Sequence, residues 1–263
     1  MALRATVLRS IFSGTARSAR SPLSHPRTFA TLSNLLDANA AAYPQQEIVR
    51  YERNNVKWSH GEVKTYSDAM VKGMQEMGLQ RGDAILSWLP AESPEQHVLQ
   101  FACAKAGFVL NCLSHSVTSS SAFETAIRET KAVAVFTPSA IGDTNYLSHV
   151  RETIPEVTNW NETLGLPFLS TKFPELKHCI HTGFDSERGL TNYKHIMTFN
   201  GEPADLAKEG DKLARDVDDN GKPGKFMTHK DISKAESWSV VCKIAQKEYT
   251  ECNNRFNEGG LPY

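Results

Sequence analysis

Residues 78–136 alternate short apolar runs with helix signals, and this alternation constrains the fold more than any other feature of the chain. The apolar run at residues 84–89 ends at a proline, as expected for a buried strand. A Ser-Pro-Glu sequence at residues 93–95 then supplies a helix N-cap, a proline in the first turn and a first-turn acid, and Gly107 ends that helix. A strand, a helix and a strand follow at residues 108–110, 118–130 and 132–136. The order βαβαβ predicts an α/β fold with a doubly wound, largely parallel sheet.

The sequence on either side of this block adds further elements. Upstream we expect a helix over residues 32–42, two paired or neighbouring strands over 47–52 and 56–59, and a helix over 65–77. Downstream the pattern is weaker. There we expect a helix at 146–154, a loop at 159–174, a strand at 176–181, a polar helix at 203–215, and one long C-terminal helix at 231–253 before a polar ending at 254–263.

Short motifs run through the same region at fixed spacing. They are Leu79, Arg81-Gly82-Asp83, Leu89-Pro90, Pro94-Glu95 and Ala104-x-x-Gly107, with Thr31-Leu32, Tyr43-Pro44 and Thr65-Tyr66 upstream. Over residues 31–136 this set resembles the N-terminal part of the adenylate-forming acyl-CoA synthetases, the AMP-binding family. The resemblance implies an α/β domain at residues 30–200, like the N-terminal subdomain of those enzymes. Residues 201–263 would then carry the phosphate-loop region and a helical tail.

The family resemblance also implies where the phosphates of ATP would bind. The enzymes carry a loop rich in Ser, Thr and Gly that ends in Gly-x-Pro-Lys-Gly, whose N–H groups and lysine hold the phosphates. In this chain the hydroxyl-rich part has become acidic, and a glycine stands where the lysine is expected. The degenerate loop comprises Asp216, Asp218, Asp219, Asn220, Gly221, Pro223 and Gly224. Each carboxylate about 4 Å from a phosphate charge would cost on the order of 4 kcal/mol, so we expect no catalytic residue and no bound cofactor.

The length of sequence after this loop leads to the same expectation. Only 42 residues follow Gly221. In the family, the adenine-binding segment and a C-terminal domain with a catalytic lysine lie beyond that point. We therefore expect a pseudoenzyme derived from an acyl-CoA synthetase.

Two other patterns hint at a metal site, although each lacks ligands. Residues 216–221 match the first half of an EF-hand loop with residues 203–215 as the entering helix, but the twelfth position is Met227. In His178-Cys179-x-His181, neighbouring side chains on a strand would point to opposite faces. We expect no metal. The five cysteines show no CxxC spacing and are expected to be free thiols in a reducing compartment.

Charge is distributed unevenly along the chain. Five arginines and no acid precede Asp37, so the net charge of −1 leaves −6 for residues 37–263, which argues against a nucleic-acid partner. An acid-free, arginine-rich start is typical of a mitochondrial presequence, here residues 1–29 with cleavage after Phe29. The sequence contains no run of 18 apolar residues, so we expect no transmembrane span. We expect the protein to be located in the mitochondrial matrix or on the matrix side of the inner membrane. Peripheral association with that membrane is one option.

These features predict a structural role. An enzyme scaffold without its active half exposes sheet edges and apolar faces that partners would cover. We expect a catalytically inactive accessory subunit of a large mitochondrial assembly, the ATP synthase or a respiratory complex, whose partners are the other protein subunits. Two alternatives stay open: a binding module for acyl-CoA, fatty acid or nucleotide, and a half-enzyme completed by a partner chain.

Overall fold

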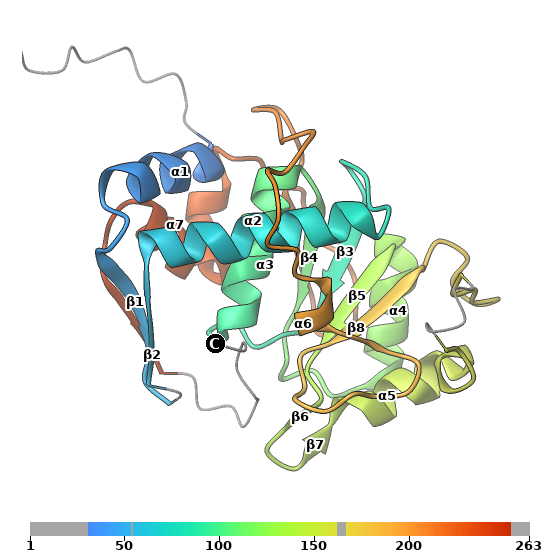
Figure 1. The fold of residues 1–263 in the computed structure, drawn as a ribbon. Coiled ribbons are helices and arrows are strands. Elements are labelled where there is room, and N and C mark those ends of the chain that lie inside the picture. The colour runs from blue at the N-terminus through green and yellow to red at the C-terminus, as the bar shows by residue number, and fades with distance from the viewer. Residues whose placement is uncertain (1–30, 54, 162–166, 254–263) are drawn as a thin grey trace, which may run out of the picture.

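The computed structural model describes residues 31–53, 55–161 and 167–253 (Figure 1). Its centre is a six-stranded sheet in the order β10-β4-β3-β5-β8-β9, in which every neighbouring pair is parallel. The strands are β3 (Ala84–Ser87), β4 (Val109–Leu113), β5 (Ala134–Thr137), β8 (His178–His181), β9 (Thr191–Asn192) and β10 (Ala214–Val217). The expected doubly wound parallel sheet is confirmed. The expected presequence and the polar ending lie outside the described residues.

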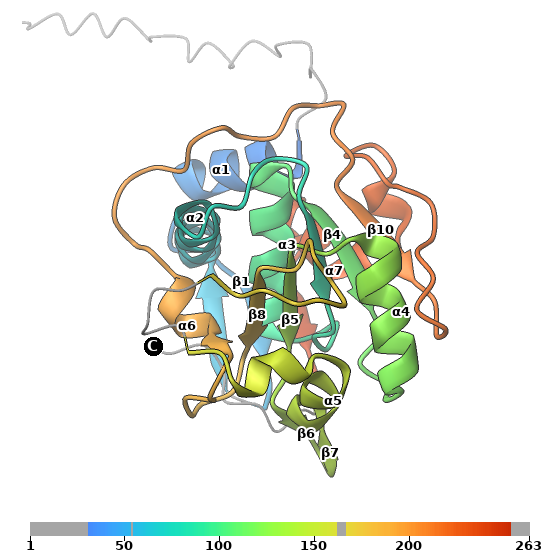
Figure 2. The ribbon, with the colours of Figure 1, turned by 90° about the vertical axis from the view of Figure 1, so that its right-hand side faces the viewer.

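Helices cover both faces of this sheet, which gives three layers (Figures 1 and 2). One face packs against α1 (Leu32–Ala42), α2 (His60–Glu76), α3 (Pro94–Ala106) and α7 (Ser239–Ala245). The other packs against α4 (Ser120–Thr130) and α5 (Tyr146–Thr153). Each face has its own buried apolar cluster, so alternate residues of the strands supply opposite cores, as in α/β proteins. On the second face, the rings of Trp88 and Phe123 stack with their centroids 4.4 Å apart.

Helix α3 follows the sequence signals closely. Ser93 accepts a hydrogen bond from the N–H of Gln96, a proline occupies the first turn, and Gly107 closes the helix in the left-handed conformation with φ of 75°. All 13 of its residues are buried, because other helices and the sheet surround it. Helix α2 begins earlier than expected. Ser59 and Glu62 form a capping box, so the helix starts at His60 instead of residue 65.

A second, three-stranded sheet lies beside the helical layer, in the order β11-β1-β2. Strands β1 (Glu47–Tyr51) and β2 (Val56–Ser59) form the expected antiparallel hairpin. Strand β11 (Thr250–Cys252) pairs with β1 in parallel. The remaining short elements are β6 (Ala140–Ile141), β7 (Thr144–Asn145), α6 (Tyr193–Ile196) and the 3₁₀ turns η1 (Pro155–Thr158), η3 (Ile232–Lys234) and η4 (Glu236–Trp238).

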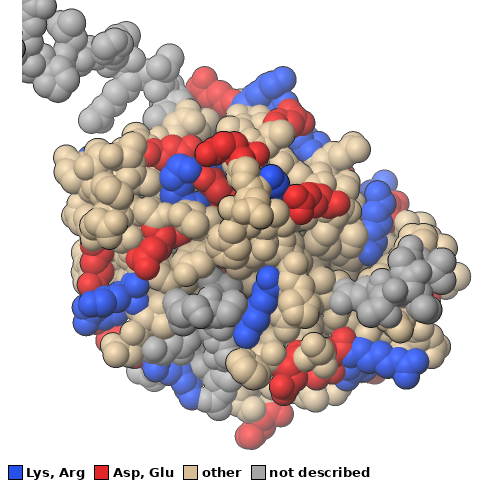
Figure 3. Space-filling model, viewed as in Figure 1, with Lys and Arg blue, Asp and Glu red and all other residues tan. Residues whose placement is uncertain are grey.

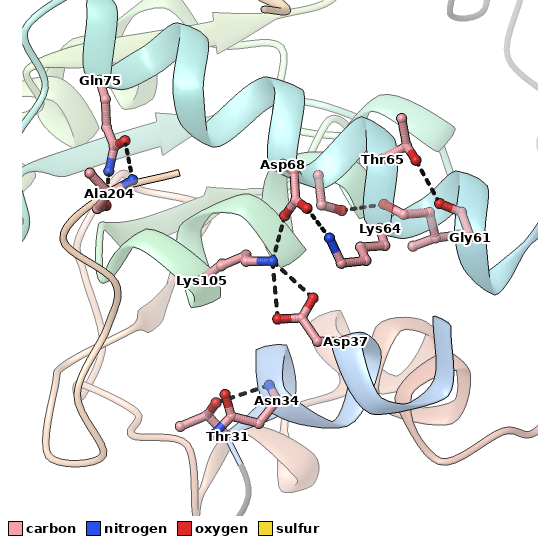
Figure 4. A network of polar contacts seen from close by, with 12 residues as sticks. Thr31, Asn34, Asp37, Gly61, Lys64, Thr65, Asp68, Gln75, Lys105 and Ala204 are labelled. Carbon is pink, nitrogen blue, oxygen red and sulfur yellow. Dashed lines mark hydrogen bonds and ion pairs between the residues drawn. The ribbon is translucent and has the colours of Figure 1, made fainter. Parts of the chain in front are cut away.

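A buried lysine joins three helices of the first layer (Figure 4). Lys105 of α3 is 4% exposed, and its Nζ lies 2.9 Å from a carboxylate oxygen of Asp37 on α1 and 2.5 Å from one of Asp68 on α2. Lys64 of α2 also contacts Asp68, at 2.5 Å. The ammonium group is thereby held between two carboxylates, which offsets the cost of removing it from water.

The expected C-terminal helix over residues 231–253 is wrong. The segment contains two 3₁₀ turns, the short helix α7 and the strand β11. Trp238 is fully buried and anchors the start of α7. Lys247 has φ of 67°, a left-handed conformation that stops the helix and turns the chain into β11. The long-range pairing of β11 with β1 therefore overrides local helical propensity.

The expected polar helix over residues 203–215 is also wrong. The segment approaches the sheet without helical structure, and Ala214–Val217 forms β10 at the sheet edge. A side chain of this segment bonds to a distant part of the chain: Asp211 accepts a hydrogen bond from Arg81 Nε at 2.7 Å. The backbone at Asp205 has a positive φ of 44°. Among the described residues, no helix is both long and apolar enough to span a bilayer.

Candidate functional site

The sheet has a topological switch point between β3 and β4. The chain leaves β3 toward α3 on one face and leaves β4 toward α4 on the other, so the loops after these strands separate. Ligands of doubly wound proteins bind in such a crevice at the carboxyl ends of the strands. A cavity of about 330 Å³ lies here. It is lined by Leu89, Ala91, Gln96, Cys112, Leu113, Ser114, His115, Asp216, Val217, Glu236 and Ser237.

The polar groups of this cavity largely bond to one another. Ser87 donates to Gln96 Oε1 at 2.5 Å, and Gln96 Nε2 lies 3.5 Å from the sulfur of Cys112. Ser237 donates to Asp216 Oδ1 at 2.7 Å. Burial, with the Asp216 carboxylate nearby, raises the pKa of the Cys112 thiol to about 12. The thiol therefore stays protonated near neutral pH and is a poor nucleophile.

The cavity is acidic. Asp216 and Glu236 line it, and none of its described lining residues is a lysine or an arginine. Burial lowers the pKa of His115, so this imidazole is neutral at pH 7 and adds no positive charge. Bound phosphates need cations or free N–H donors to offset their charge. The lining side chains supply no cation.

The turn after β10 contains most residues of the expected degenerate loop. Bridges from Val217 to Pro223 and from Ala214 to Met227 fold it into a narrow hairpin. At its tip, the carboxylate of Asp218 accepts hydrogen bonds from the backbone N–H groups of Asn220, at 3.0 Å, and Lys222, at 2.8 Å.

Backbone groups close the rest of this turn. The N–H of Asp218 donates to the carbonyl of Lys222, and that of Gly221 donates to the carbonyl of Asp218, each at 2.9 Å. The N–H of Gly224 donates to the carbonyl of Asp216 at 2.8 Å. The carboxylate of Asp218 thus occupies the inside of the turn, and most backbone N–H groups of the turn donate to acceptors within it.

Gly221 fixes where this turn lies. Its φ is 82°, and a Cβ atom there would lie 2.1 Å from the carbonyl oxygen of Ala122 and 2.8 Å from the nitrogen of Ala126. The turn therefore packs directly on the backbone of α4, and only glycine fits both the conformation and the contact. The retained glycine has a clear packing role in this hairpin.

The structure brings the predicted loop residues together without making them a cation site. Asp216 is bonded to Ser237, and Asp218 is bonded to backbone N–H groups. Asp219 and Asn220 are exposed at the tip. The entering helix of an EF-hand is absent from residues 203–213. No cluster of three or more His, Cys, Asp or Glu side chains suited to a metal occurs in the described part of the chain.

Other side chains around the cavity have structural roles. Ser114 and Ser116 hydrogen-bond to each other at 2.8 Å, and Ser119 caps α4. The side chains of Gln96, Glu236 and Ser237 were not identified from the sequence. Gln96 lies inside a helix pattern. Glu236 and Ser237 fall in the segment expected to be helical, so no local signal placed them at the sheet.

A buried carboxyl group lies near the site, at the start of α3. Burial raises the pKa of Glu95 to about 7, and Tyr193 donates to the backbone carbonyl of Glu95 at 3.1 Å. His97, two residues on, contacts the hydroxyl of Tyr51 through Nδ1 at 2.7 Å. Burial lowers the pKa of His97 to about 4. Glu95 was read from the sequence only as a first-turn acid.

A doubly wound parallel sheet is an architecture found in many nucleotide-binding α/β domains. Residues 36–186 match the family model described as AMP-binding enzyme. The chain belongs to this family, as an acyl-CoA synthetase-like adenylate-forming domain.

Curated relatives agree with this assignment. YngI of Bacillus subtilis is 26% identical over 188 residues, which are 71% of this chain and 33% of that protein. The mitochondrial medium-chain acyl-CoA ligase ACSF2 of Danio rerio is 27% identical over 134 residues, 51% of this chain and 22% of that protein. The chain thus spans a third or less of the length of these two relatives.

Solved structures share the fold at low identity. The acetoacetyl-CoA synthetase of Streptomyces lividans has a TM-score of 0.68 at 13% identity, covering 85% of this chain and 38% of that one. The N-terminal domain of FACL13 from Mycobacterium tuberculosis has a TM-score of 0.64 at 13% identity, covering 87% of this chain and 58% of that one. The described elements therefore share the fold of these two structures, one of which is an N-terminal domain.

Proposed function

We propose that this chain is a non-catalytic member of the AMP-binding family that serves as an accessory subunit of a large mitochondrial assembly. The observation that carries the proposal is the turn after β10. There the carboxylate of Asp218 accepts hydrogen bonds from the backbone N–H groups of Asn220 and Lys222. Phosphate oxygens would need those donors, and a negative charge already occupies their place.

Electrostatics favours the same conclusion. A triphosphate at the turn would face Asp218 and Asp219, with Asp216 in the adjoining cavity. Each carboxylate at about 4 Å from a phosphate charge costs on the order of 4 kcal/mol at an effective dielectric of 20. Solvent reduces this figure for the exposed tip, and Lys222 and Lys225 of the same turn offset part of the repulsion, so the occupied N–H donors carry most of the argument.

A subunit role and a mitochondrial location rest on separate observations. Large apolar side chains are exposed at several loops, including Leu169 and Phe184, each at 75%. Such residues suit contacts with permanent partners. Several relatives are named as mitochondrial ligases, and the arginine-rich start fits import into the matrix. The ATP synthase or a respiratory complex would be an assembly of the right kind.

Two measurements test this proposal. Acyl-dependent pyrophosphate exchange by the full chain reports adenylate formation, and we expect a rate equal to that of a no-protein blank. Purification under native conditions from mitochondria should place the chain in a large complex. Migration as a single chain, at or below the 29.2 kDa of the full sequence, would contradict the subunit role, and exchange above the blank would contradict inactivity.

A second function is favoured by the cavity itself. A space of about 330 Å³ at the switch point falls at the lower end of small-molecule sites. A binding module for acyl-CoA, fatty acid or nucleotide would use it, and so would a half-enzyme completed by a partner chain. Thermal-shift titration with ATP, AMP, acyl-CoA and fatty acid separates these functions. Stabilisation by any of them would favour a ligand-binding role over a purely structural one.

A further inference from the structure

A groove of about 870 Å³ lies beside the small sheet, away from the cavity at the switch point. We call it the aromatic groove. Trp58 of β2, Tyr66 of α2 and Phe199 form its wall, with Trp58 and Tyr66 at 5.2 Å and Tyr66 and Phe199 at 6.2 Å between ring centroids. The other described lining residues are Pro44, Gln45, Glu47, Lys57, Ser59, Gly61, Glu62 and Thr65. A row of aromatic rings next to proline and acidic side chains is typical of peptide-binding grooves.

Unused hydrogen-bonding groups lie along this groove. The indole N–H of Trp58 is buried and has no hydrogen-bond partner among the residues that the structure describes. β2 is also an edge strand of its sheet. In the antiparallel ladder with β1, alternate residues bond across the pair, so the backbone N–H and carbonyl of Lys57 point outward. An unpaired strand edge is stabilised when an extended segment pairs with it.

We propose that residues 254–263 of this same chain bind in the aromatic groove. β11 belongs to the same sheet and ends at Cys252, which pairs with Tyr51 at the far end of the β1–β2 hairpin. From there to Trp58 is about 12 Å, because the path crosses two strand spacings of about 4.8 Å and runs two residues of about 3.4 Å along the sheet. The ten residues of the segment can extend roughly 33 Å. Tethering supplies an effective concentration of about millimolar, so weak contacts suffice.

The composition of the segment matches the groove. Arg255 provides a cation, while Phe256 and Leu261-Pro262-Tyr263 provide apolar groups. Glu62 is exposed, and the backbone N–H and the hydroxyl of Ser59 both donate to its Oε2 atom. Its other oxygen remains available to a guanidinium group. An extended peptide with arginine and proline is the kind of ligand that an acidic, aromatic groove recognises.

Limited trypsin digestion of the full chain tests this binding, with mass spectrometry to follow cleavage after Arg255. Proteolysis tracks the population of the released segment. We expect Phe199→Ser, which removes one wall of the groove, to raise the cleavage rate by about fivefold. Glu62→Gln should also raise it, because glutamine keeps the capping box but loses the charge. Phe184→Ser is the matched control, since Phe184 is even more exposed than Phe199, 75% against 58%, and lies outside the groove.

Each outcome is decisive. A cleavage rate that rises in the two groove variants and not in the control, at an unchanged melting temperature, supports the proposal. Equal rates in all four proteins would overturn it, because the segment would then be free of the groove. Protection that grows with protein concentration would also overturn it, since the occupant would be the segment of a second copy.

Discussion

Asp218→Ala removes both the charge and the acceptor that close the turn after β10. Two hydrogen bonds to backbone N–H groups are lost. At this exposed tip each is worth about 0.5–1.5 kcal/mol, so the variant should lose roughly 1–3 kcal/mol of unfolding free energy. A melting temperature lower by several degrees would follow.

The same substitution should create affinity for phosphate. It frees the N–H groups of Asn220 and Lys222 and removes one repulsive charge. Taken together, and discounted for solvent, these changes should improve the binding of tripolyphosphate by about 3 kcal/mol, roughly a hundredfold. Isothermal titration calorimetry of the full chain at low salt measures this change directly.

Two matched variants separate charge from geometry. Asp219→Asn removes a neighbouring exposed charge without breaking either Asp218 bond, so its effect on affinity should stay within about tenfold. Asp218→Asn keeps an acceptor for the turn and should lose less stability than Asp218→Ala. If the unmodified chain binds tripolyphosphate as tightly as Asp218→Ala, the carboxylate does not block the loop and our reasoning is refuted.

Three further predictions concern stability. Lys105→Met should cost about 3 kcal/mol by urea unfolding because Asp37 loses its ion-pair partner and Asp68 keeps only Lys64, while Lys172→Met, at an exposed pair, should cost under about 1 kcal/mol; equal losses would contradict this. Gly221→Ala should cost more than about 2 kcal/mol, since its Cβ would strike α4, whereas Gly78→Ala has open space and should cost about 1 kcal/mol. Glu95 has its pKa raised to about 7, so the folded state holds a proton that the unfolded state releases, and stability should fall by up to about 3 kcal/mol from pH 4.5 to pH 7. Glu95→Gln should remove that slope in parallel unfolding curves, and a slope unchanged in the variant would refute the assignment.

The parts of the fold that local signals encode were predictable. The cap at Ser93 and the stop at Gly107 defined α3 to within a residue. The apolar runs gave β3, β4 and β5 in parallel order. Signals of this kind act within one or two helical turns, so the sequence contains them directly.

Elements that depend on distant partners were not predictable. β11 pairs with β1 about 200 residues away. Its local sequence fits a strand no better than it fits the helix expected there. β10 likewise owes its conformation to β4. In the site, the residues of the degenerate loop were identified from the family pattern. The role of Asp218 as an internal cap needed the hairpin geometry, which no spacing in the sequence reveals.

The acidic turn has a simple physical rationale. A phosphate loop presents several N–H groups that a ligand satisfies, and such groups are costly when they lack a partner. Under the proposed function, the chain does not bind that ligand and must satisfy these groups from within. Asp218 does this for two donors, and Gly221 allows the turn to lie flat on α4. The two residues therefore depend on one another. The loss of stability in Asp218→Ala should be smaller when Gly221→Ala has already displaced the turn, and a double-mutant cycle with additive losses would show that they act independently.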